Sequence, residues 1–102
     1  MAEFIEVARL DQVPPGKGRS FTVGEKELAL FNVDGTIYAT NDGCLHKGSS
    51  LGWGGLLDGK VVTCRVHGWK YDVTTGSVLS SPEMKLGCYP VKIEQDKVLV
   101  EI

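Results

Sequence analysis

The chain has 102 residues, a length that corresponds to a single domain. Eleven basic and thirteen acidic residues give a formal net charge of −2, so the chain lacks the excess positive charge with which proteins bind nucleic acid. No apolar run approaches the ~20 residues that a membrane-spanning helix needs. These numbers favour a small soluble domain that binds neither nucleic acid nor a membrane.

The first six residues and the cysteines bear on the cellular compartment. Glu3 and Glu6 stand where a secretory signal would carry Lys or Arg, so we expect a cytoplasmic protein. In that compartment cysteine binds metal or reacts more often than it forms disulfides. Three cysteines also cannot pair completely with one another. The cysteines, and the only two histidines, are therefore the candidate functional residues.

Alternation of apolar and polar residues, broken by frequent turn signals, predicts an all-β domain of short antiparallel strands without a long helix. In chain order the predicted strands span residues 4–7, 19–23, 27–33, 36–40, 60–64, 69–73, 77–79, 91–93 and 98–102. Asp34-Gly35 predicts a two-residue hairpin turn. Pro14-Pro15-Gly16 and Pro82 are expected to break regular structure. The last hairpin is expected to close the core with its apolar face, Ile93 included.

The stretch from Asn41 to Gly59 follows no strand pattern and contains six glycines. A long irregular loop in a compact domain is generally functional or disordered. This one contains the apolar residues Leu51, Trp53 and Leu56, which favour an anchored functional loop.

Two short boxes combine one cysteine and one histidine each, Cys44-Leu45-His46 and Cys64-Arg65-Val66-His67. Seventeen residues lie between His46 and Cys64. A Cys2His2 set can bind structural zinc, but zinc fingers usually pair cysteine with cysteine and histidine with histidine. A Cys/His hydrolase would need only one of the two boxes. The paired boxes therefore favour another metal centre.

Cys-x-His followed by Cys-x-x-His resembles the ligand pattern of the Rieske iron–sulfur family. Residues 64–72, CRVHGWKYD, resemble the second cluster loop of Rieske ferredoxins and of Rieske domains in ring-hydroxylating oxygenases. The resemblance implies the Rieske fold, a small antiparallel β-sandwich or barrel with an inserted cluster-binding subdomain. We expect one domain over residues 1–102, with that subdomain at about residues 41–84.

The same resemblance implies one [2Fe–2S] cluster. Cys44 and Cys64 would bind the inner iron, and His46 and His67 the outer iron near the surface. Replacing two thiolates by neutral imidazoles makes reduction easier and gives Rieske centres potentials of about −150 to +300 mV.

Four further residues are expected around the cluster. Lys47 either contributes to a basic rim for an acidic partner or is solvated surface charge. Gly68 either allows the backbone to approach the cluster or forms a plain turn. By resemblance, Tyr71 occupies the position of a hydrogen-bond donor to a ligand sulfur, whereas Trp69 replaces a serine donor; packing under the loop is the alternative for both. Cys88 matches no ligand position and is expected to be a buried free thiol.

The residue inventory limits the function. The cluster takes both histidines, so none remains for the mononuclear iron of an oxygenase catalytic subunit, and no dinucleotide fingerprint is present. The resemblance implies a monomeric electron carrier between an NAD(P)H-dependent flavoprotein reductase and a terminal oxygenase, often one that attacks aromatic rings. Both partners would dock transiently near His46 and His67. A redox subunit of another enzyme, such as nitrite reductase, and a zinc-stabilised interaction module are the alternatives.

We predict a reduction potential at the low end of the Rieske range. Ser49 and Val66 stand where high-potential Rieske proteins carry a disulfide, and Trp69 removes a donor that favours reduction. A redox titration followed by visible absorption measures the midpoint. A value like that of the respiratory Rieske proteins would contradict the prediction.

Overall fold

The computed structural model describes residues 3–42, 56–64 and 68–101. In this part of the chain nearly all regular structure is β-strand, with one turn of 3-10 helix, η1 (Leu10–Gln12). The strands are β1 (Phe4–Arg9), β2 (Gly18–Val23), β3 (Lys26–Val33), β4 (Thr36–Asn41), β5 (Leu56–Asp58), β6 (Val61–Thr63), β7 (Lys70–Asp72), β8 (Ser77–Val78), β9 (Ser81–Lys85), β10 (Cys88–Tyr89), β11 (Val91–Glu94) and β12 (Lys97–Glu101).

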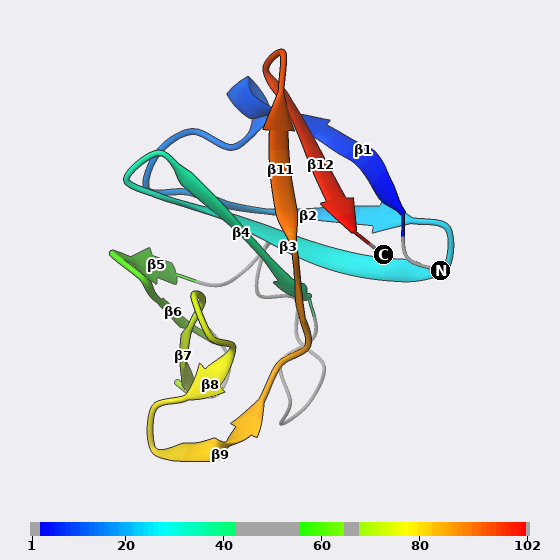
Figure 1. The fold of residues 1–102 in the computed structure, drawn as a ribbon. Coiled ribbons are helices and arrows are strands. Elements are labelled where there is room, and N and C mark those ends of the chain that lie inside the picture. The colour runs from blue at the N-terminus through cyan, green and yellow to red at the C-terminus, as the bar shows by residue number, and fades with distance from the viewer. Residues whose placement is uncertain (1–2, 43–55, 65–67, 102) are drawn as a thin grey trace.

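These strands form three sheets, in the orders β1-β12-β11, β10-β4-β3-β2 and β5-β6-β7-β8-β9. All the strand pairs are antiparallel. In Figure 1 the first two sheets cross one another, and the five-stranded sheet lies below them. The all-β class predicted from the sequence is thus confirmed.

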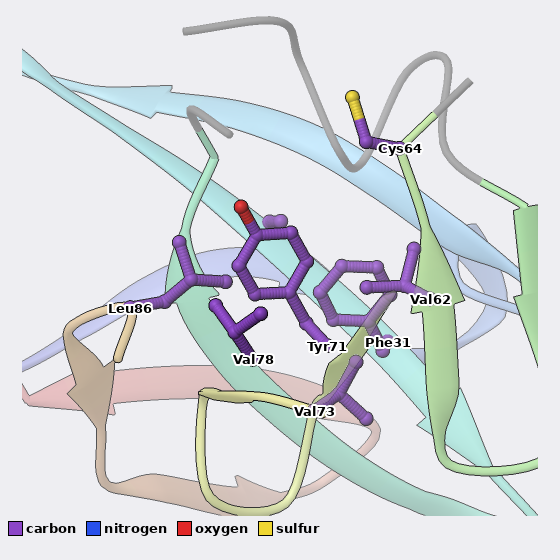
Figure 2. Close-up of a cluster of buried hydrophobic side chains, with 8 residues drawn as sticks. Phe31, Val62, Cys64, Tyr71, Val73, Val78 and Leu86 are labelled. Atoms are coloured by element: carbon purple, nitrogen blue, oxygen red, sulfur yellow. The ribbon is translucent and has the colours of Figure 1, made fainter. Parts of the chain in front are cut away.

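The central strand β3 is buried on both faces. Its run Leu28-Ala29-Leu30-Phe31 is fully buried, and alternate side chains point to opposite faces. Leu28 and Leu30 belong to one apolar cluster, with Ala8, Val13, Ile37, Ala39, Val98 and Val100. Ala29 and Phe31 belong to a second, with Val62, Cys64, Tyr71, Val73, Val78 and Leu86 (Figure 2). One strand therefore supports both halves of the core.

The five-stranded sheet is an insertion between two neighbouring strands. The chain leaves β4 after Asn41 and comes back as β10, whose Cys88 and Tyr89 pair with Thr40 and Ala39. The two ends of the insertion therefore lie side by side. This arrangement agrees with the inserted unit that the sequence resemblance implied.

The local turn signals were good predictors. Asp34 and Gly35 both have positive φ, 52° and 93°, as the predicted hairpin turn requires. Gln95 and Asp96, with φ of 49° and 62°, form a similar turn between β11 and β12.

Two expectations were wrong. Pro82 does not break the chain but lies inside β9, which is possible because β9 is the edge strand of its sheet. Ile93 is 42% exposed because β11 is also an edge strand, whereas its partner Val98 on the middle strand is buried. The strands β5, β9 and β10 were not predicted.

Gly76 packs tightly against the returning chain, and we predict that Gly76→Ala is strongly destabilising. An added Cβ would lie 2.6 Å from the Leu86 carbonyl oxygen and 2.8 Å from the Cys88 sulfur, and φ is +80°. Gly24→Ala is the matched control, because Gly24 also has a positive φ, +60°, but open space around it. We expect a loss of about 1 kcal/mol for Gly24→Ala. Gly76→Ala should lose a further ~1–3 kcal/mol from overpacking. Equal losses in chemical denaturation would contradict this prediction.

Candidate functional site

Cys64 directly follows β6, at the end of a hairpin that β6 forms with β7. Its backbone N–H donates to the Trp69 carbonyl oxygen at 2.7 Å, and the Gly68 N–H donates to the Cys64 carbonyl oxygen at 2.8 Å. Gly68 has a φ of +73°, the left-handed conformation that glycine adopts without strain. These bonds join Cys64, the first residue of the second cysteine–histidine box, to Gly68 and Trp69, which follow the box in sequence.

The Cys64 side chain is shielded from water. The residue is 1% exposed and belongs to the apolar cluster around Phe31. Figure 2 shows the Cys64 sulfur and the Tyr71 hydroxyl pointing toward the same end of this cluster. A rigidly held thiol in such a place is well suited to bind a metal centre.

Tyr71 and Trp69 both pack under the hairpin. Tyr71 is fully buried and lies between Val62 and Val78 in the sheet, while Trp69 is half-buried against the same cluster. No buried side-chain nitrogen or oxygen in the described part of the chain lacks a hydrogen-bond partner. Both aromatic residues therefore pack against the apolar cluster around Phe31.

The first cysteine–histidine box begins just after residues that the structure fixes firmly. Asp42 is 3% exposed, and its N–H donates to the Glu27 carbonyl oxygen at 3.2 Å. The Ser20 hydroxyl lies 3.0 Å from Asp42 Oδ1 and 3.1 Å from Oδ2. Sequence reasoning did not single out Asp42, because no local signal shows that an acidic residue at the start of a loop will be buried.

Cys44, His46, Lys47 and His67 lie outside the described residues. Among the residues that are described, no group of three or more His, Cys, Asp or Glu side chains could hold a metal ion. The chemistry of the predicted donor set, two thiolates and two imidazoles, suits a Rieske [2Fe–2S] cluster. The buried thiol of Cys64 and the left-handed turn at Gly68 are consistent with such a cluster.

Cys88 corrects an expectation, because it is exposed rather than buried. It belongs to the two-residue edge strand β10, which has a neighbour on one side only. Its sulfur nevertheless lies near the backbone of Gly76 and Leu86, and this partial burial raises the pKa of the Cys88 thiol.

The described part of the chain contains no helix with the length and apolar character to cross a membrane.

Comparison with known proteins gives a consistent assignment. The family model for the Rieske [2Fe–2S] domain matches residues 3–90. The chain is 43% identical over 99 residues to the biphenyl dioxygenase ferredoxin subunit of Pseudomonas sp. strain KKS102, which covers 96% of this chain and 91% of that one. It is 37% identical over 101 residues to the ferredoxin component of the naphthalene 1,2-dioxygenase system of Pseudomonas aeruginosa. That match covers 98% of this chain and 96% of the relative.

Solved structures agree with these relatives. The Sphingomonas yanoikuyae B1 ferredoxin superimposes with a TM-score of 0.89 at 27% identity and covers 98% of this chain and 99% of its own. A chain from the complex of reduced oxygenase and oxidised ferredoxin in carbazole 1,9a-dioxygenase superimposes with a TM-score of 0.85 at 36% identity. The match covers 96% of this chain and 92% of that chain.

Asp72 stabilises the hairpin that carries Cys64, and we predict that it does so in a pH-dependent way. Burial alone would raise the pKa of its carboxyl. The carboxylate accepts hydrogen bonds from the Thr74 N–H at 2.9 Å and the Thr74 hydroxyl at 2.5 Å, and the Lys60 ammonium lies 3.5 Å away. Together these interactions lower the pKa by more than burial raises it. The net pKa lies below its ordinary value. The carboxylate therefore stabilises the fold above the unfolded-state pKa, and this contribution disappears as the pH falls through the folded-state pKa.

Asp72→Asn should accordingly be less stable at neutral pH and lose less stability than the parent between about pH 6 and pH 2. Thermal melting across that range measures both effects. Asp58→Asn is the control, because the side chain of exposed Asp58 makes no hydrogen bond or ion pair with the described residues. Parallel pH profiles for the parent and Asp72→Asn would contradict the prediction.

Proposed function

The chain belongs to the Rieske [2Fe–2S] family, and we propose that it is the ferredoxin of a multicomponent oxygenase system. It would accept one electron at a time from an NAD(P)H-dependent flavoprotein reductase and pass it to a terminal oxygenase of the aromatic-ring type. The observation that carries this proposal is the similarity to dioxygenase ferredoxins, which extends over nearly the whole of both chains. The relatives are ferredoxin components and not catalytic subunits.

We propose Cys44 and Cys64 as ligands of the inner iron, and His46 and His67 as ligands of the outer iron. The bound cluster supplies a reversible one-electron redox centre. The protein contributes the placement of its ligands: the hairpin hydrogen bonds hold the Cys64 backbone, and the surrounding apolar cluster excludes water from its side chain. These contacts support Cys64 directly, and the spacing of the boxes supports the other three residues.

We further propose that the Tyr71 hydroxyl donates a hydrogen bond toward a ligand sulfur. Its direction, toward the same end of the apolar cluster as the Cys64 sulfur, supports this role (Figure 2). Such a donor favours the reduced form, whereas Trp69 in place of a serine removes another donor. The balance is consistent with a potential at the low end of the Rieske range.

Docking of both partners near His46 and His67 belongs to the same proposal, with Lys47 at its rim. Gly68, next in sequence to His67, is exposed, which supports a contact surface at this end of the molecule. A small, transient interface suits a carrier that must leave each partner. A monomeric state, a cytoplasmic location, and a single domain over residues 1–102 with a cluster-binding subdomain at about 41–84 stay predictions.

A reconstituted electron-transfer assay tests this function. The purified protein, mixed with the reductase and oxygenase of a biphenyl dioxygenase system, should carry electrons from NADH to product formation. It should contain iron and acid-labile sulfide in equal amounts. Zinc without iron, or a cluster that the reductase reduces but that supports no oxygenase turnover, would contradict the proposal.

Cys64→Ser should abolish cluster assembly and turnover, because it removes a buried ligand. Cys88→Ser is the matched control and should retain both, since Cys88 is exposed and matches no ligand position. Because ligand binding contributes to folding free energy, the cluster-free Cys64→Ser protein should also melt below the parent. Normal iron content in Cys64→Ser would refute the ligand assignment.

A further inference from the structure

The two ends of the inserted unit are joined by hydrogen bonds. The Asn41 N–H donates to the Gly87 carbonyl oxygen at 2.8 Å, and the Tyr89 hydroxyl donates to Asn41 Oδ1 at 2.6 Å. These bonds fix the end of β4 to the chain that comes back from the insertion. The next residue, Asp42, is fixed by other parts of the fold.

Asp42 is held by two different strands. Ser20 of β2 places its hydroxyl 3.0 and 3.1 Å from the two carboxylate oxygens, and Glu27 of β3 accepts the Asp42 N–H at 3.2 Å. Asp42 is 3% exposed, so its carboxylate is almost completely removed from water. A buried carboxylate is costly unless hydrogen bonds compensate for the lost hydration, and the Ser20 hydroxyl provides one.

Asp42 stands two residues before the proposed cluster ligand Cys44 in the chain. Two residues of fully extended chain span at most ~7 Å, so the two Cα atoms are no farther apart than that. Water and salt screen charges weakly in a buried environment. A negative charge there opposes the arrival of an electron at a nearby iron–sulfur cluster, whose potential depends on local charge.

We propose that Asp42, held by Ser20, is a positioning residue that fixes the start of the first cluster-binding segment and lowers the reduction potential of the cluster. This inference rests on the proposed function, because it takes Cys44 as a ligand. Ser20 acts through Asp42: it comes from a strand outside the inserted unit and ties the segment before Cys44 to the four-stranded sheet.

Three variants test the proposal. Asp42→Asn keeps the shape of the side chain and removes its charge, and Ser20→Ala removes the hydroxyl and keeps the carboxylate. Thr22→Ala is the matched control: Thr22 lies two residues farther along β2 on the same face, is exposed, and makes no hydrogen bond through its hydroxyl to the described residues. Each protein is assayed for iron and sulfide, for its midpoint potential, and for the rate at which it releases iron to a chelator.

We expect Asp42→Asn to have a higher midpoint potential than the parent, a change that a purely structural role would not produce. Ser20→Ala should release its cluster about tenfold faster, as the loss of a hydrogen bond to a charged group implies. Thr22→Ala should match the parent in both measurements.

An Asp42→Asn protein with a full cluster and the parent's potential would overturn the electrostatic role. Ser20→Ala releasing iron at the Thr22→Ala rate would overturn the positioning role. If Asp42→Asn assembles no cluster, that result counts against the electrostatic role, and Ser20→Ala decides the positioning role by the same criterion. A parent protein without iron and sulfide would instead refute the proposed function, so the two failures are distinguishable.

Discussion

Burial of both faces of β3 is the constraint on which the rest of the structure depends. Leu28 and Leu30 support the core between the first two sheets, whereas Ala29 and Phe31 support the inserted unit. A strand covered on both sides needs a continuous apolar run, and this one has it. Gly18 pairs with Phe31 on the neighbouring strand, where an added Cβ would lie 2.8 Å from the aromatic ring. The close packing of Phe31 thus fixes where the inserted unit meets its support.

The candidate site depends on that contact. Phe31 lies in the same apolar cluster as Val62, Cys64 and Tyr71, so the strand that organises the whole core also supports the hairpin that carries the proposed cluster ligand Cys64 (Figure 2). The hydrogen bonds between Cys64, Gly68 and Trp69 then fix the local geometry. Rigidity matters for an electron carrier, because ligands that do not move keep the reorganisation energy of each electron transfer small.

Much of this arrangement could be predicted from the sequence, because its signals are local. The Asp34-Gly35 turn, the alternation along the strands and the paired cysteine–histidine boxes each depend on residues close together in the chain. The features that were missed depend on distant ones. Pro82 fits within β9 only because that strand is at an edge, Cys88 is exposed because β10 has one neighbour, and Asp42 is buried because Ser20 and Glu27 come from strands far earlier. Edge positions and long-range burial leave no local signature.

The side-by-side ends of the insertion make this architecture modular. Every buried member of the apolar cluster around Leu28 and Leu30 comes from outside residues 42–87, so that part of the core does not need the inserted unit for its own packing. The hydrogen bond from Asn41 to Gly87 closes the gap at the base of the unit. A different metal-binding cassette with similarly spaced ends could therefore be grafted onto the same scaffold, provided that it presents an apolar surface to Ala29 and Phe31.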